Sequence, residues 1–261
     1  MAILITSPRL AQLIQGVSIT FGILLIWQAI ISLNHLPDFI LPSPWRVLVT
    51  LYQQAPLLLE QTWPTLIETI SGLSGGICLG MVMAIGMMRL SLLRWCLLPL
   101  LIISQAIPIF AIAPLFVIWF GYGMTSKIAT TILMLFFPVA SAFFDGLKRT
   151  PQAWLDLAKT MDASPWRVLC FIQIPAALPA LASGIRVATV MAPLGAIIGE
   201  WVGASRGLGF LMLNANARMQ IDLMFACLMI IMALALLLYV TVNHLLRLAL
   251  PWHLREETTY A

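Results

Sequence analysis

Six apolar stretches, each long enough to cross a lipid bilayer, constrain this chain more than any other feature of its sequence. A transmembrane helix needs about 20 predominantly apolar residues. In lipid the backbone must satisfy its own hydrogen bonds, so each stretch is predicted to be a helix. The stretches lie at about 14–34, 64–88, 95–120, 125–145, 176–201 and 222–249.

The composition agrees with this assignment, because 61% of the residues are hydrophobic and only 9% are charged. A soluble domain carries about 25% charged residues, and a water-soluble fold could not bury this much apolar surface. We therefore expect an all-α polytopic membrane protein in which residues 1–261 form a single transmembrane domain. The net charge of +4 is typical of the basic loops of membrane proteins and indicates no nucleic-acid partner.

Lysine and arginine residues gather on one side of the predicted spans. With a cytoplasmic N-terminus, nine of them fall in inner segments and four in outer segments. Because cytoplasmic loops carry such an excess of positive charge, we expect both termini in the cytoplasm. The longest outer segment is then about 35–63, with an amphipathic interfacial helix over 45–59, and the longest inner segment is about 146–175.

The hexapeptide Ser-Pro-Trp-Arg-Val-Leu occurs twice, at 43–48 and at 164–169. The two copies fall on opposite sides of the membrane in the expected topology, so they cannot bind the same partner. In both copies the serine suits a helix N-cap and the proline suits the first helical turn. We interpret the recurrence as independent helix-start chemistry rather than as a duplication or a shared functional motif.

The inner segment is the most polar part of the chain and reads GLKRTPQAWLDLAKTMDASPWRVLCFIQIPAALP over 146–179. Thr150-Pro151 is predicted to begin a short helix that reaches about Met161. Ser164-Pro165 is predicted to begin a second helix, which Pro175 ends. Two short helices joined by a tight turn would form a compact knob on the inner face.

The first of these helices has one apolar face, because Trp154, Leu157 and Met161 recur at spacings of three and four residues. That face has two interpretations. It either rests on the helix bundle beside a solvated loop, or it forms a rigid surface for a soluble partner. Periodicity alone favours neither.

The stretch DLAKTMDASPWRVLCFIQIP, residues 156–175, resembles the signature loop of the permease subunits of binding-protein-dependent ABC importers. That signature is Glu-Ala-Ala, then Gly after three further residues, then Ile-x-Leu-Pro after about nine more. Residues 156–158 take the opening triplet and residues 172–175 the closing stretch. Asp156 replaces the usual Glu, and Asp162 stands where Gly is usual, although Asp tolerates a left-handed backbone.

Further stretches resemble the nitrate, sulfonate and taurine branch of the same family, in matching order along about 200 residues. They are LPSP at 41–44, IPIFAIAPLFVIWFGYG at 107–123, SKI at 126–128, FFP at 136–138 and GIR at 184–186. Several such matches in order are a much more specific signal than one short motif.

The resemblance implies the type I permease fold of ABC importers, in the bacterial cytoplasmic (inner) membrane. It also implies three protein partners besides membrane lipid: a second permease copy in a homodimer, an extracytoplasmic substrate-binding protein, and a dimer of cytoplasmic ATPase subunits that bind ATP and Mg. The chain has no Walker A pattern, so we expect no cofactor and no enzyme activity in it. The implied ATPase-docking residues are Trp154, Asp156, Leu157, Ala158, Asp162, Ser164, Arg167 and Pro175.

Pro108 and Pro114 interrupt the apolar stretch at 95–120. Each removes a backbone hydrogen bond, and broken transmembrane helices are tolerated where they line protein or a cavity. Ser104, Gln105 and Pro108 are therefore candidates for the translocation pathway. A kink that serves packing alone is the alternative.

Ionisable residues inside apolar spans are costly and often functional. Glu200, near the outer end of the stretch at 176–201, is predicted to face the pathway or a gate, with exposure at the interface as the alternative. Arg186 is a weaker pathway candidate, because its long side chain can reach the cytoplasmic surface. Glu68 is expected to sit at the outer interface.

The remaining small residues predict packing rather than chemistry. Gly72, Gly76 and Gly80 form a stripe for close helix contact, with the stretch at 176–201 or a second copy of the chain as the partner. The four cysteines form no CxxC pair, so neither a disulfide nor a metal site is predicted. They are Cys78, Cys96, Cys170 and Cys227.

The stretch GEWVGASRGLGFLMLNANARMQIDLMFA, residues 199–226, resembles permeases that take up pyrimidine precursors of thiamine. A hydroxymethylpyrimidine-type compound is therefore the expected substrate, with an aliphatic sulfonate, taurine or nitrate as the alternative. A stand-alone secondary transporter is a more remote alternative, since no internal repeat or embedded set of coupling charges is visible. No convergent set of catalytic residues in the spans favours an intramembrane enzyme.

Overall fold

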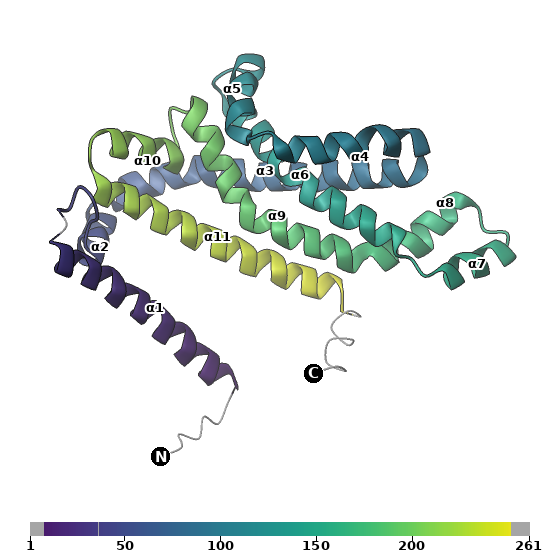
Figure 1. Cartoon of the computed structure of the whole chain (residues 1–261), viewed down its shortest axis with the longest axis horizontal. Helices are drawn as coiled ribbons and strands as arrows, with labels where there is room; N and C mark the ends of the chain where they lie inside the picture. The colour runs from purple at the N-terminus through teal and green to yellow at the C-terminus, as the bar shows by residue number, and fades with distance from the viewer. Residues whose placement is uncertain (1–7, 36, 252–261) are drawn as a thin grey trace. The chain divides into compact units, whose positions relative to one another are not determined.

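The computed structural model describes residues 8–35 and 37–251, and every regular element among them is a helix (Figure 1). This confirms the all-α prediction. In chain order the elements are α1 (Pro8–Asn34), α2 (Pro44–Gln53), α3 (Ala55–Arg89), α4 (Ser91–Ala106), α5 (Ile109–Phe120), α6 (Met124–Lys148), α7 (Gln152–Thr160), α8 (Pro165–Val168), a π-helical turn (Leu169–Gln173), α9 (Ile174–Gly203), α10 (Leu208–Ala217) and α11 (Ile221–Ala249).

The chain divides into two compact units. One takes the residues up to Leu59 together with Leu211–Met229, and the other takes Glu60–Phe210 together with the residues from Ile230 onward. The expectation of a single domain over 1–261 stays a prediction.

Helices cover all six apolar stretches. Among the residues that the structure describes, four helical segments are long and apolar enough to cross a membrane: α3, α6, the continuous helix Pro165–Gly203, and α11. Shorter apolar helices account for the other two stretches. Phe21–Asn34 lies within the first, and Ser91–Leu101 and Ile109–Phe120 lie within the third.

The third stretch is two helices rather than one kinked span. α4 ends at Ala106, and Ile107 has an extended backbone with ψ 122°. Because a proline disfavours helical geometry in the residue before it, Pro108 converts the expected kink into a full break. Pro114, in contrast, lies inside α5 and does not end it.

Two helix boundaries on the expected outer side differ from the prediction. The helix expected over 45–59 ends at Gln53, and α3 begins at Ala55 and continues through Pro64. Gln54 between them has φ −99° and ψ 13°, which interrupts the helical register. α10 was not predicted from the sequence at all.

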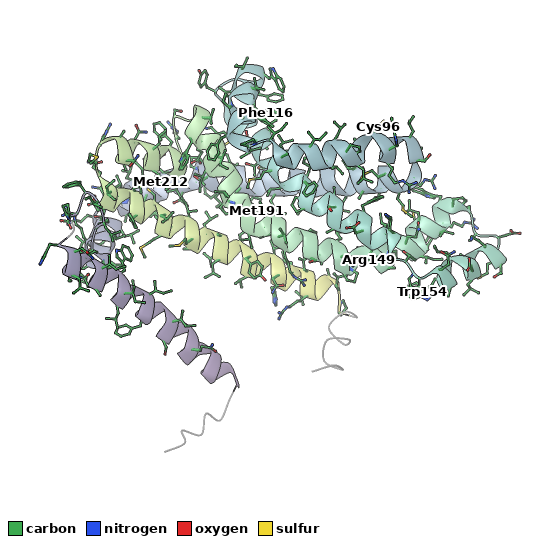
Figure 2. The ribbon with its side chains drawn as sticks, in the orientation of Figure 1. Cys96, Phe116, Arg149, Trp154, Met191 and Met212 are labelled. Atoms are coloured by element: carbon green, nitrogen blue, oxygen red, sulfur yellow. The ribbon has the colours of Figure 1, made fainter. Side chains whose placement is uncertain are left out.

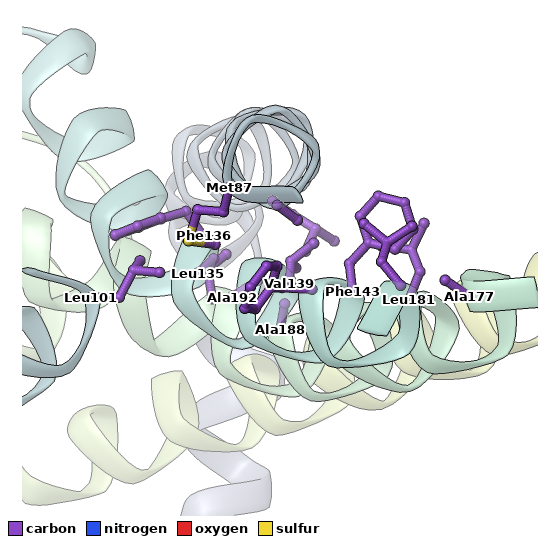
Figure 3. Packing of buried hydrophobic residues seen from close by; sticks show 14 of the residues in the cluster. Met87, Leu101, Leu135, Phe136, Val139, Phe143, Ala177, Leu181, Ala188 and Ala192 are labelled. Atoms are coloured by element: carbon purple, nitrogen blue, oxygen red, sulfur yellow. The ribbon is translucent and has the colours of Figure 1, made fainter. Parts of the chain in front are cut away.

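The core of the larger unit lies where α6 and α9 run side by side (Figure 3). α6 contributes Val139 and Phe143, and α9 contributes Leu181 and Ala188, all buried. Small residues allow this close contact. A Cβ at Gly184 would lie 2.8 Å from the carbonyl oxygen of Pro138 on α6.

The glycine stripe of α3 packs on α6, which corrects the expected partner. A Cβ at Gly76 would lie 2.8 Å from the Cβ of Leu135, and a Cβ at Gly80 would lie 2.8 Å from the Cβ of Val139. Gly72 meets Thr131 in the same way. The stripe was identified from sequence, but its partner was not, because spacing on one helix carries no information about the facing helix.

In the smaller unit, Arg46 of the first Ser-Pro-Trp-Arg-Val-Leu copy pairs with Asp38, and its Nε lies 3.7 Å from a carboxylate oxygen of Asp222. Thr50 donates a 3.0 Å hydrogen bond to the same Asp222 oxygen. Arg167, the equivalent residue of the second copy, is exposed like Arg46, but the ion pairs of the described residues do not include it. The two arginines therefore differ in their charged partners.

Both copies nevertheless begin a helix by the same local chemistry. Ser43 and Ser164 have nearly the same extended backbone, and each accepts a hydrogen bond from the N–H of the arginine three residues later, at 3.3 and 3.4 Å. A proline occupies the first turn in both. The prediction of recurrent helix-start chemistry is confirmed.

Candidate functional site

The loop predicted to dock an ATPase begins with α7, whose start differs from the prediction. Pro151, not Thr150, occupies the N-cap position of α7. The Thr150 hydroxyl instead donates a 3.0 Å hydrogen bond to the carbonyl of Leu147, in the last turn of α6. Thr150 therefore ends one helix rather than beginning the next.

The turn after α7 shows how Asp162 replaces the usual glycine. Asp162 has φ 51°, in the left-handed region. The Ala163 N–H bonds to the Ala158 carbonyl and the Asp162 N–H bonds to the Lys159 carbonyl, both at 3.0 Å. This pair of bonds is a Schellman motif, so the tight turn forms without glycine.

The second loop helix continues into the membrane span, and the prediction that Pro175 ends it is wrong. α8 passes through the π-helical turn directly into α9, which gives one helix from Pro165 to Gly203. The Ile174 N–H bonds to the Leu169 carbonyl, five residues back. This wider turn receives Pro175 in the first turn of α9, where a missing N–H is tolerated.

The apolar face of α7 is exposed, which argues against the interpretation that it rests on the bundle. The exposed fractions of Trp154, Leu157 and Met161 are 52%, 61% and 74%. Figure 2 shows Trp154 projecting from α7. Ala158, one helical turn after Trp154 and therefore beside the exposed face, is buried.

A cavity of about 710 Å³ opens beside this face. α7 lines it with Trp154, Leu157 and Met161, and the other wall includes Phe171 and Pro179. Phe171 is also exposed, so apolar surface continues from α7 to the π-helical turn. An unpaired apolar surface of this kind is typical of a binding site for another protein.

The other docking candidates are also exposed: Asp156, Asp162, Ser164, Arg167 and Pro175. The Lys159 ammonium donates a 3.2 Å hydrogen bond to the Asp156 carboxylate and the Gln152 amide donates one of 3.1 Å. These two hydrogen bonds hold the pKa of Asp156 below its usual value, and the bond from Lys159 has the larger effect.

The loop is also tied to the end of α3. The guanidinium of Arg89, the last residue of α3, lies 5.2 Å from the ring centroid of Trp166. This is a cation–π distance. A second cavity of about 550 Å³, lined by Arg89, Leu155 and Gln173 among others, lies at this junction.

A buried charge network forms a second notable site. Glu68 on α3 is 0% exposed and Glu200 on α9 is 1% exposed. The ammonium of Lys127 on α6 lies 3.4 Å from a carboxylate oxygen of Glu68. Neither carboxyl group is therefore exposed, which excludes interfacial exposure as the alternative for Glu200. The position of Glu68 at the level of the outer interface stays a prediction.

Three consecutive backbone N–H groups at the start of α10 bind side chains of this network. The Gly207 N–H bonds to Gln61 at 2.7 Å, the Leu208 N–H to the Thr65 hydroxyl at 2.9 Å, and the Gly209 N–H to Glu200 at 2.5 Å. A helix leaves its first N–H groups without intrahelical partners. Here side chains of α3 and α9 supply the acceptors, so α10 is capped by two other helices and not by its own residues.

The two glycines of the Gly-Leu-Gly sequence at 207–209 are explained by the same carboxylate. Gly207 has φ 115°, and any Cβ there would overlap the Glu200 carboxylate. A Cβ at Gly209 would lie 2.8 Å from Glu200 Oε2. Both positions therefore need a residue without a side chain.

Sequence reasoning did not assemble this network. The available signal was the presence of Glu68 and Lys127 inside predicted apolar stretches, since ionisable residues within spans usually pair with one another. Their pairing could not be read from spacing, because the residues come from three different helices.

The other pathway candidates are less clustered. The side chains of Ser104 and Gln105 lie outside the described part of the structure, while Pro108 is exposed at the break between α4 and α5. Arg186 is half-buried, and its Nε donates a 3.0 Å hydrogen bond to the side chain of Asn243 on α11. A pathway role for these residues and for Glu200 stays a prediction.

Comparison with known proteins identifies the class. Residues 76–251 match the family model described as the inner membrane component of binding-protein-dependent transport systems. The chain belongs to this family. The permease is 51% identical to a probable ABC transporter permease of Haemophilus influenzae, over 90% of this chain and 96% of that protein.

Several relatives have similar sequence identity to this permease, but their names refer to different substrates. A formylaminopyrimidine transport permease of Halalkalibacterium halodurans is 32% identical (90% and 94% covered). A riboflavin permease of Chloroflexus aurantiacus is 33% identical (94% and 95%), and a taurine permease of Escherichia coli is 29% identical (94% and 92%). These relatives confirm the nitrate, sulfonate and taurine branch and its pyrimidine-type members.

The fold of the permease is also that of solved ABC importer structures. A chain of the inward-facing MetNI methionine ABC transporter superimposes with a TM-score of 0.63 at 20% identity, over 75% of this chain and 97% of that one. The type I permease fold, with about six transmembrane helices, is thereby confirmed. The protein is a multi-pass inner-membrane component of an ABC importer.

Proposed function

We propose that this permease forms the translocation pathway for a small organic solute, and that ATP hydrolysis in a separate cytoplasmic subunit drives transport. α7 and the turn at Asp162 dock into that ATPase. Two permease copies pair, and an extracytoplasmic binding protein supplies the solute. Both termini are cytoplasmic in this arrangement, in accord with the distribution of basic residues.

The observation that carries this proposal is the exposed apolar face of α7. Trp154 and Leu157 are large, more than half exposed, and held on a short helix whose C-terminus is fixed by the Schellman turn. Buried aromatic and apolar side chains provide most of the energy of a protein interface. An ATPase groove that covers these residues would explain why they remain uncovered in the isolated chain.

The helix from Pro165 to Gly203 supports a mechanical role for the loop. A helix without a break behaves as a stiff rod, so displacement of its cytoplasmic start is carried into the span. The contact between Arg89 and Trp166 joins the end of α3 to the same rod. Movement of the docked ATPase would therefore reach two transmembrane helices together.

The chain itself offers a matched control for testing this docking role. Trp154 and Leu157 on α7 have the same spacing as Trp45 and Leu48 on α2, which are exposed as well. We expect the double variant Trp154→Ala/Leu157→Ala to lose binding of the ATPase at least about tenfold, a loss typical of interface hot spots. Trp45→Ala/Leu48→Ala should bind the ATPase normally. Unchanged copurification of the ATPase with the α7 variant would refute the docking assignment.

For the substrate, we propose a pyrimidine of the thiamine-precursor type. The formylaminopyrimidine relative and the resemblance at 199–226 support it, while the taurine relative supports a sulfonate alternative. Selectivity in this class rests largely with the binding protein. Thermal-shift screening of the cognate binding protein should show stabilisation by a pyrimidine. Stabilisation by taurine, an aliphatic sulfonate or nitrate, without a pyrimidine response, would replace the first assignment by the second.

A further inference from the structure

The buried network contains more negative charge than its partners balance. Among the described residues it holds two carboxyl groups, Glu68 and Glu200, and one ammonium, Lys127, all of them more than nine-tenths buried. With both carboxyl groups ionised, the network would carry a net charge of −1 within the membrane-spanning helices. An uncompensated buried charge is strongly destabilising.

The two carboxyl groups have unequal surroundings. Glu200 accepts hydrogen bonds from the Thr65 hydroxyl at 2.6 Å and the Gly209 N–H at 2.5 Å, and it faces the N-terminus of α10. Donors of this kind stabilise the ionised form of a carboxyl group, as does the positive end of a helix dipole. Glu200 is therefore equipped to hold the negative charge.

Neither oxygen of Glu68, in contrast, receives a hydrogen bond. Its one charged partner is Lys127, and the distance of 3.4 Å is long for a charge-assisted hydrogen bond. Glu68 also faces Glu200 closely enough for the two carboxyl groups to interact. Two carboxyl groups that share a buried site cannot both ionise readily, and one of them keeps its proton.

We propose that Glu68 and Glu200 form a proton-binding site, with the proton on Glu68 donated toward the carboxylate of Glu200. The network is then neutral: Glu68 carries no charge, and Glu200 balances Lys127. The proton supplies the hydrogen bond that the oxygens of Glu68 otherwise lack. It also holds α3 against α9 at the place where both bind the start of α10.

Infrared spectroscopy of the purified chain at neutral pH tests this site. Protonated carboxyl groups have a carbonyl stretch that ionised ones lack, and the other described carboxyl groups are exposed or paired with a cation. We expect one such band, shifted by deuterium exchange and absent from Glu68→Gln. Glu60→Gln, a change at an exposed position of the same helix, should retain it.

A third variant distinguishes a proton shared between Glu68 and Glu200 from a proton that Glu68 would hold without Glu200. In Glu200→Gln, Glu68 and Lys127 form a neutral ion pair without a proton, so the band should disappear although Glu68 is intact. Absence of the band from the wild-type chain, or its persistence in Glu68→Gln, would overturn the proposal. If Glu200→Gln does not fold, the wild-type chain and Glu68→Gln still decide the question. A band that survives in folded Glu200→Gln would also overturn it.

Discussion

The hydroxyl of Thr65 on α3 donates a 2.6 Å hydrogen bond to the carboxylate of Glu200 on α9, although 135 residues separate them in the chain. The same hydroxyl oxygen accepts the backbone N–H of Leu208. One side chain thus connects two membrane-spanning helices and the helix that follows them. Polar contacts therefore join α3, α9 and α10 here, whereas the cluster around α6 and α9 is hydrophobic.

The connecting role of Thr65 predicts a large effect from removing one oxygen atom. Thr65→Val keeps the shape of the side chain but leaves Leu208 N–H and one Glu200 oxygen without this partner. Loss of a buried hydrogen-bond partner costs about 1–3 kcal/mol, and we expect unfolding free energy in detergent to fall by that amount. Thr241→Val is the control, because the hydroxyl of Thr241 is exposed and bonds within its own helix. Equal effects of the two changes would contradict the assigned role.

The close approach of Glu200 predicts that position 207 accepts only glycine. In Gly207→Ala the new methyl group would need a positive φ and would displace the Glu200 carboxylate. We expect a loss of about 2 kcal/mol or more, measured as a lowered midpoint of thermal unfolding. Gly22→Ala on α1 has no heavy atom within 4 Å of the added carbon, so it should be neutral or stabilising. A stable Gly207→Ala variant would show that the loop can move away from the carboxylate.

The left-handed turn at Asp162 predicts opposite effects of two substitutions. Asp162→Gly removes the cost of a positive φ and restores the residue usual in the related loop, so assembly with the ATPase should be retained. Asp162→Val places a β-branched side chain in the left-handed region, which is strongly disfavoured. We expect Asp162→Val to lose ATPase binding while thermal unfolding of the membrane part changes little. Normal assembly of Asp162→Val would show that this turn does not set the position of α7.

The contact between α3 and α6 predicts that bulk at Gly76 separates these helices. Gly76→Leu places a side chain where Leu135 already lies 2.8 Å from the position of a Cβ. Overpacking of this kind costs about 1–3 kcal/mol, and we expect a lower unfolding midpoint with little change in helix content by circular dichroism. Gly22→Leu, at a glycine without such neighbours, is the control. Unaltered stability of Gly76→Leu would mean that α3 does not need this close approach.

Local features of the candidate loop could be predicted from sequence because their causes are local. Ser164 caps its helix through a bond to a residue three positions away, and Asp162 can adopt a positive φ by its own chemistry. The end of the second loop helix could not be predicted in this way. A proline normally suggests a break, and no local pattern in the sequence indicated the π-helical turn that precedes Pro175.

The sequence by itself determined the class of the molecule, its helical segments and the position of the loop, because apolar length, capping residues and a family signature all lie along the chain. Only the tertiary structure decided the partners of Glu68, Lys127 and Glu200, and the need for glycine at 207. Those relationships join residues on three helices. A buried charge is stabilised by whatever lies beside it in space, and spacing within any one helix cannot specify that neighbour.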